Sequence, residues 1–138
     1  MIALDTNIVI RLVTADDPVQ LAVAREIFQS GDLWICKTAL LETEWVLRYS
    51  YELSRVAIGE VLRGLLGYPP LRVEDRNAVL RALALYDRGV DFADALHLVS
   101  SGESEKFATF DRPLAKAARG FEGVPSVELV GKKSSPGT

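Results

Sequence analysis

Five short apolar runs, separated by segments with helical signals, constrain the fold of this chain more than any other feature. The runs are IALD (2–5), LWIC (33–36), LRV (71–73), KFATF (106–110) and SVELV (126–130). Each has the length of a buried strand, and one or two helices fit between successive runs. Strands that alternate with helices form α/β domains in which a mainly parallel sheet is covered on both faces. We therefore expect an α/β fold with about five strands.

Polar residues mark where the helices begin. Asp17-Pro18 offers a capping side chain followed by proline at the first helical position, and Gly31 is expected to stop this helix. The other helices are expected to begin near Asn7 and at Thr38, Ser54, Asp75, Asp91 and Asp111. With these elements, residues 1–130 are expected to form a single domain and residues 131–138 a flexible C-terminal tail.

Composition places the chain among soluble globular proteins. Its 138 residues suit one domain, and 49% of them are hydrophobic and 25% charged. No apolar run approaches the roughly 20 residues needed to span a bilayer. The N-terminal residues lack the pattern of a secretory signal, and a single cysteine, Cys36, excludes an internal disulfide. These features predict a cytoplasmic protein without a membrane partner.

Two acidic residues directly follow predicted strands. Asp5 ends the first strand, and Asp111 comes immediately after KFATF. Ligands of parallel α/β folds bind beyond the carboxyl ends of the strands, so both acids are candidates for one binding site. Each also stands where a helix begins, and an N-cap role explains an aspartate there equally well. Both interpretations stay open at this point.

The helix TALLETEWVLRYSY carries a third candidate. At about 100° per residue, Glu42 shares a helix face with Trp45 and Tyr49, which predicts a carboxylate on an apolar, core-facing stripe. A buried charge must be paired or must bind a metal. The alternative is a Glu42 at the rim of that face, with its carboxylate in water. Glu44 falls on another face beside Arg48 at i+4, where an exposed ion pair accounts for it.

A fourth candidate, Asp94, lies in the segment GVDFADALHLVSSG. Asp91 is a natural helix cap, and Asp94 three residues later fits a capping arrangement. The first turn of a helix can equally aim a carboxylate at a site above the sheet. Asp94 is therefore a candidate for the same site as Asp5 and Asp111.

Carboxylates that gather at one site need a counter-ion. Two unit charges about 4 Å apart interact by roughly 4 kcal/mol at an effective dielectric constant of 20. Mg²⁺ and Mn²⁺ prefer oxygen ligands, and such a cation can polarise a phosphate and activate a bound water. The net charge of −3, from 19 acidic and 16 basic residues, does not exclude a nucleic-acid partner if several acids bind a metal.

Four sequence blocks, in this order, resemble the PIN-domain ribonucleases: DTN after the first strand, LLETEWVLR, DFADALHL and ATFD. Within that family the resemblance is to the VapC-type toxins of toxin–antitoxin pairs, and it covers residues 2 to about 130. It implies a three-layer α/β/α sandwich and an endoribonuclease that uses Mg²⁺ or Mn²⁺ and leaves a 5′-phosphate and a 3′-hydroxyl. It also implies a small antitoxin protein as partner and a homodimer.

Carried over residue by residue, the family's catalytic acids fall on Asp5, Glu42, Asp94 and Asp111, with Asp5 and Asp94 as metal ligands. The roles of some neighbours stay open. Thr6 and Thr109 either hydrogen-bond the carboxylates or cap helices, Asp91 is expected to be a cap, and His97 is expected to be structural. The basic residues considered for RNA phosphates, each also explained as a solvated charge, are Arg11, Arg48, Arg112 and Lys116.

Three rival interpretations share the α/β pattern. A phosphoacceptor signalling module needs adjacent acids after the first strand, whereas Asp5 is followed by Thr6 and Asn7. A haloacid-dehalogenase-like phosphatase needs a second aspartate two residues after the first, where this chain has Asn7. A noncatalytic partner-binding domain is disfavoured by the intact set of four acids.

Overall fold

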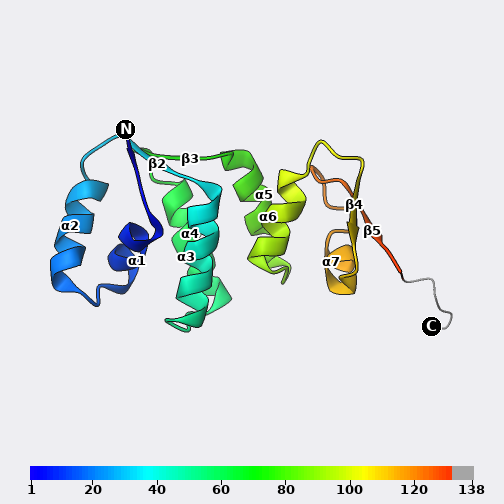
Figure 1. The fold of residues 1–138 in the computed structure, drawn as a ribbon, viewed down its shortest axis with the longest axis horizontal. Coiled ribbons are helices and arrows are strands. Elements are labelled where there is room, and N and C mark those ends of the chain that lie inside the picture. Colours follow the sequence, from blue (N-terminus) through cyan, green and yellow to red (C-terminus); the bar gives the residue numbers. More distant parts are fainter. Residues whose placement is uncertain (132–138) are drawn as a thin grey trace. The chain divides into compact units, whose positions relative to one another are not determined.

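The structure, a computed structural model, describes residues 1–131, which form seven helices and five strands (Figure 1). The chain divides into two compact units, Met1–Arg76 and a second unit that begins at Asn77. The predicted tail, residues 131–138, lies outside the described residues apart from Gly131. The expectation that residues 1–130 form one domain stays a prediction. Among residues 1–131, no helix combines the length and apolar composition that crossing a membrane requires.

The first unit places four helices beside a small parallel sheet (Figure 1). Its strand order is β1-β2-β3, and both neighbouring pairs are parallel. Leu33 on the central strand lies opposite Ile2 on one side and Leu71 on the other. Parallel strands require crossover connections, and the helices supply them. The elements are β1 (Ile2–Ala3), α1 (Thr6–Thr14), α2 (Pro18–Phe28), β2 (Leu33–Ile35), α3 (Lys37–Tyr49), α4 (Arg55–Leu66) and β3 (Leu71–Val73).

The second unit contains three helices and a two-stranded parallel sheet. β4 pairs with β5 in a register that puts Phe107 opposite Val127. The rings of Tyr86 and Phe92 meet edge to face, with centroids 5.6 Å apart, and both are buried. The elements are α5 (Arg76–Asp87), which begins at the last residue of the first unit, α6 (Phe92–Ser100), β4 (Lys106–Thr109), α7 (Arg112–Ala117) and β5 (Ser126–Leu129).

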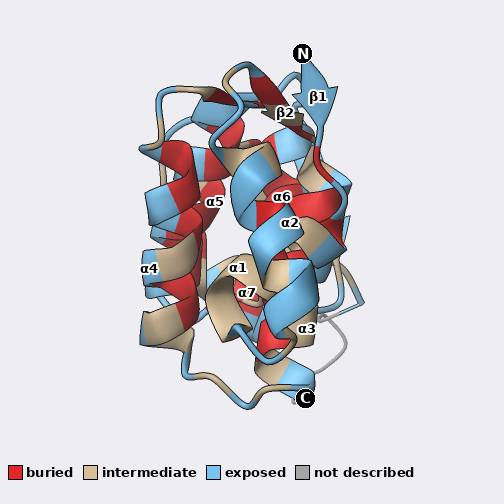
Figure 2. Cartoon of the chain, turned by 90° about the vertical axis from the view of Figure 1, so that its left-hand side faces the viewer, coloured by how far each residue is buried: buried red, intermediate tan, exposed pale blue. Residues whose placement is uncertain are grey.

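Buried residues recur along one stripe of the amphipathic helices, as Figure 2 shows for α4 and α5. In α4 the stripe includes Ile58, Leu62 and Leu65, at spacings of four and three residues. In α5 it includes Val79 and Leu83, also four residues apart. This spacing places the side chains on one face of a helix, so burying that stripe stabilises each unit.

The five predicted strands are confirmed, and every strand pairing is parallel. Within residues 1–131 they form sheets of three and two strands, so the largest sheet is smaller than predicted. β4 and β5 are also less buried than predicted, because exposed residues alternate with half-buried ones. Lys106 and Glu128 occupy exposed positions, and their side chains form an ion pair of 3.8 Å.

Side-chain caps begin five of the helices, as predicted. In each, an aspartate or serine accepts a hydrogen bond from a backbone N–H of the first turn, which satisfies a donor that the helix leaves unpaired. The five residues are Asp5, Asp17, Ser54, Asp91 and Asp111.

The cap predicted at Thr38 is wrong. The N-cap residue of α3 is Cys36, two residues earlier, and its side chain caps nothing. The helix begins at Lys37, whose backbone N–H donates to Glu74 Oε1 at 2.9 Å. The carboxylate of Glu74, which follows β3, thus takes the place of a side-chain cap from the residues next to α3. Asp75 precedes α5 as predicted, but its carboxylate lies 3.3 Å from Lys37 Nζ. Tertiary contacts therefore redirect both acids toward the start of α3.

Candidate functional site

Asp5 and Glu42 are linked through a buried threonine in the first unit. Asp5 is exposed and accepts a hydrogen bond from the Thr6 backbone N–H at 2.8 Å, as the cap of α1. The Thr6 hydroxyl is buried and donates to Glu42 Oε1 at 2.6 Å. Of the two roles left open for Thr6, its side chain therefore takes that of a hydrogen-bond partner of a candidate carboxylate. Thr6 therefore hydrogen-bonds both candidate acids of the first unit, Asp5 through its backbone and Glu42 through its side chain.

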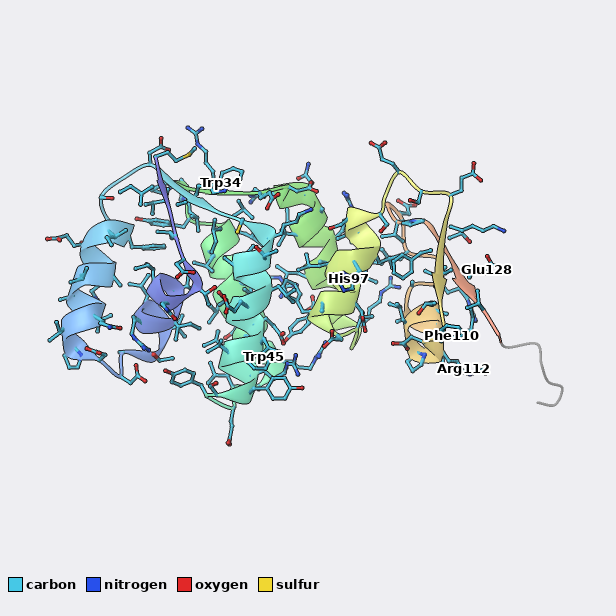
Figure 3. All side chains as sticks on the ribbon, in the orientation of Figure 1. Trp34, Trp45, His97, Phe110, Arg112 and Glu128 are labelled. Carbon is cyan, nitrogen blue, oxygen red and sulfur yellow. The ribbon has the colours of Figure 1, made fainter. Side chains whose placement is uncertain are left out.

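The predicted environment of Glu42 is wrong. Glu42 is exposed, as are Trp45 (53%) and Tyr49 (60%) on the same face of α3, so this stripe does not face the core. Figure 3 labels Trp45 on α3. Exposed aromatic side chains are common on protein surfaces, whereas a buried carboxylate needs a partner. On α3 the buried carboxylate is Glu44, and its partner is Arg48, four residues later.

Glu44 is the buried carboxylate of α3, with an exposed fraction of 1%. Arg48 donates from Nε to Glu44 Oε2 at 2.7 Å and from Nη2 to Oε1 at 3.2 Å. These hydrogen bonds raise the pKa of Arg48 above its ordinary value. The predicted ion pair is confirmed, but it is not an exposed one. Because Arg48 binds the Glu44 carboxylate in a bidentate manner, this charge can lie on the buried face of α3. Trp45 and Tyr49 lie on the exposed face.

Three aspartates of the second unit line one cavity. Asp91 caps α6 by accepting from the backbone N–H groups of Ala93 at 3.1 Å and Asp94 at 3.3 Å. Asp94 lies half-buried in the first turn of the same helix, and Asp111 caps α7. The three carboxylates line a cavity of about 310 Å³ together with parts of α7 and the Arg88–Val90 bend. We call it the acidic cavity.

The acidic cavity is electrostatically unfavourable for an ionised Asp94. Burial raises the pKa of Asp94, and the negative charges of Asp91 and Asp111 raise it further, while His97 has the opposite effect. Arg88 also lines the cavity, but it donates from Nη1 to the Ala117 carbonyl at 3.0 Å. A bound cation would relieve this repulsion. The donors are hard carboxylate oxygens, which suit Mg²⁺ or Mn²⁺.

The predicted metal ligands do not stand together as a complete site in either unit. Asp5 belongs to the first unit and Asp94 to the second. Among residues 1–131, no group of three or more His, Cys, Asp or Glu side chains is arranged to hold a metal ion by itself. The roles predicted for Asp5, Glu42, Asp94 and Asp111 therefore stay predictions.

Two predicted neighbours of the acids have defined positions. Thr109 Oγ1 accepts a hydrogen bond from the Asp111 backbone N–H at 3.0 Å, which fixes the turn that carries Asp111. His97 is exposed on α6 (Figure 3). Asp91 is a cap, as expected, and also belongs to the cavity wall. In the sequence, the signal for a place in the cavity wall is the spacing of three residues between Asp91 and Asp94, which puts both on one helical turn.

The basic residues considered for RNA phosphates divide into two groups. Arg11 Nε donates to Gln20 at 2.6 Å, and Arg11 also pairs with Asp16, so its contacts lie within the first unit. Arg48 is held by Glu44. Arg112 and Lys116 are exposed on α7. Arg88 was not among the predicted basic residues, and its place on the acidic cavity follows from the bend before Asp91.

Comparison with protein families gives one match. The family model described as the PIN domain matches residues 2–120. Comparisons with curated proteins and with solved structures give no match. The PIN fold is a three-layer α/β/α sandwich, which confirms the predicted fold class. Because the match spans most of the 138 residues, this chain belongs to the PIN domain family.

Proposed function

We propose that this protein is a metal-dependent endoribonuclease and the toxin component of a type II toxin–antitoxin system. PIN domains are generally nucleases that use divalent metals and act on RNA, and this chain is a PIN domain. The observation that carries the proposal is the acidic cavity, where Asp94 lies among Asp91 and Asp111 with its pKa raised. The neighbouring acids disfavour the ionised form of Asp94, and a bound cation would relieve that repulsion.

In this proposal the carboxylates have distinct roles. Asp5 and Asp94 would hold the cation, and Glu42 and Asp111 would complete the acidic set. The chemistry that a bound Mg²⁺ or Mn²⁺ would supply is polarisation of the phosphodiester and activation of water. Thr6 orients Glu42 through its 2.6 Å hydrogen bond, so that this carboxylate can accept a proton from the attacking water. The products are a 5′-phosphate and a 3′-hydroxyl.

The biological part of the proposal concerns partners. A nuclease of this kind damages the RNA of its own cell and therefore needs an inhibitor. A small antitoxin protein can block the acidic cavity with an arginine or lysine, because a cationic side chain pairs with the carboxylates in place of the metal. A homodimer and a cytoplasmic location belong to the same proposal.

The test is cleavage of total RNA with Mn²⁺, with two matched substitutions. Asp5→Asn and Asp17→Asn both alter an aspartate that caps a helix, and asparagine caps equally well. We expect Asp5→Asn, like Asp94→Asn, to lose cleavage and Asp17→Asn to keep it. Equal activity of the Asp5 and Asp17 variants would contradict the proposed catalytic role. Absence of cleavage in the parent with any RNA and either metal would contradict the function itself.

A further inference from the structure

A second cavity of the second unit has the opposite chemistry to the acidic cavity. Its volume is about 670 Å³, and its walls are α7, the turn after that helix and β5. Three lining residues are basic, Arg112, Lys116 and Arg119, and none is acidic. We call it the basic cavity. Arg112 and Lys116 are among the basic residues predicted as candidates for RNA phosphates, and Arg119 joins them in the structure.

The sequence of α7 explains why the two cavities differ. Arg112, Lys116 and Arg119 are four and three residues apart, so at about 100° per residue they share one face of the helix and of the turn that continues it. Leu114 and Ala117 fall on the opposite face and line the acidic cavity. One short helix therefore has a basic cavity on one side and an acidic cavity on the other.

Among the described residues, no ion pair compensates the positive charge of the basic cavity. Within residues 1–131, Arg112, Lys116 and Arg119 are exposed and take part in no ion pair. Glu128 lies on β5 but pairs with Lys106 and does not line the cavity (Figure 3). Three like charges around one hollow create a positive potential that attracts an anion.

The remaining walls indicate what kind of anion fits. Phe121, Val124, Val127 and Leu129 are half-buried and give the cavity an apolar part. Single-stranded nucleic acids bind where basic side chains contact phosphates and where aromatic or apolar side chains contact bases. An inorganic anion alone would not use the apolar wall. The combination fits a nucleotide chain.

We propose that the basic cavity binds backbone phosphates of the single-stranded RNA that the acidic site cleaves, an inference that rests on the proposed nuclease function. The two cavities lie on opposite faces of α7, and a helix is about 10 Å across. RNA bound in the basic cavity therefore has to pass around this helix to reach the acidic cavity.

The test measures RNA binding without cleavage. An unstructured, fluorescently labelled RNA of about 12 nucleotides is titrated in EDTA at salt concentrations between about 50 and 200 mM. For single strands, log K falls with log salt by about 0.7 per neutralised phosphate. Lys116→Gln/Arg119→Gln is therefore expected to make this slope shallower by about 1.4. The control, Arg25→Gln/Arg72→Gln, changes the net charge equally at exposed positions of α2 and β3 and is expected to keep the parental slope.

Each outcome decides the assignment. Equal slopes in all three proteins, equal losses in both double variants, or no salt-dependent RNA binding by the parent would overturn the inference. Tighter binding of a poly-glutamate peptide of the same charge, lost in Lys116→Gln/Arg119→Gln, would make the basic cavity a docking site for an acidic protein instead. Thermal melting verifies that both double variants are folded. Because EDTA prevents metal-dependent cleavage, this test measures binding alone. Failure of the nuclease proposal is recognised separately, by the absence of RNA cleavage in the parent with either metal.

Discussion

The two glutamates of α3 have opposite environments, and substituting each tests the structure directly. Glu44 is buried and accepts two hydrogen bonds from Arg48, whereas Glu42 is exposed and accepts one from Thr6. We expect Glu44→Gln to lower stability and leave RNA cleavage near the parental rate. We expect Glu42→Gln to abolish cleavage and leave stability almost unchanged.

The expected loss of stability follows from the Glu44–Arg48 geometry. A hydrogen bond to a charged group contributes about 1.5–3 kcal/mol, and breaking a fully buried pair costs about 3–5 kcal/mol. The Arg48 side chain is 27% exposed, so water screens part of this interaction. We expect Glu44→Gln to lower the free energy of unfolding by about 2 kcal/mol, or roughly 6–10 °C in melting temperature. Glu42→Gln, at an exposed position, should stay within about 0.5 kcal/mol.

The assay combines thermal melting by circular dichroism with RNA cleavage at a temperature well below every midpoint. A double-mutant cycle with Arg48→Gln isolates the pair, because the second substitution should cost little once Glu44 is changed. An inactive but stable Glu44→Gln protein, together with an active Glu42→Gln protein, would refute the reasoning, since it would place Glu44 in the site.

Four further outcomes are expected. Millimolar Mn²⁺ should raise the melting temperature of the parent by mass action, and Asp94→Asn should lose most of that shift. Without metal, the pKa of Asp94 is higher in the folded than in the unfolded state, so the folded protein binds the proton more tightly. The free energy of unfolding should then fall as pH rises through that pKa. Urea titrations at several pH values measure this fall, and Asp94→Asn should remove it. Gly123→Ala should lower stability by about 1–2 kcal/mol, because Gly123 has a φ of +85° and its new Cβ would lie 2.7 Å from Arg81 Cδ. Induced alone in a bacterial host, the parent should arrest growth and Asp5→Asn at equal expression should not; equal arrest by both would contradict toxicity through the acidic site.

Local sequence patterns were sufficient for the five strands and for most of the helix starts. The five strands, and the helix starts at Asp5, Asp17, Ser54, Asp91 and Asp111, depend on short apolar runs and on side chains that hydrogen-bond the next turn of their own chain. Such interactions act over three or four residues, so they are visible in the sequence. The order of the acidic blocks likewise indicated the PIN family, and the family match bears this out.

Tertiary structure decided which side of each element is buried. The apolar content of α3 predicted that Trp45 and Tyr49 face the core, yet the buried side holds Glu44, because Arg48 compensates its charge. The cap of α3 comes from Glu74, 37 residues away, and no local pattern announces it. Helical periodicity shows which residues share a face, but only packing determines whether that face meets the core or the solvent. For the same reason, only the tertiary structure shows that Arg112 and Lys116 of α7 line one cavity together with residues of β5.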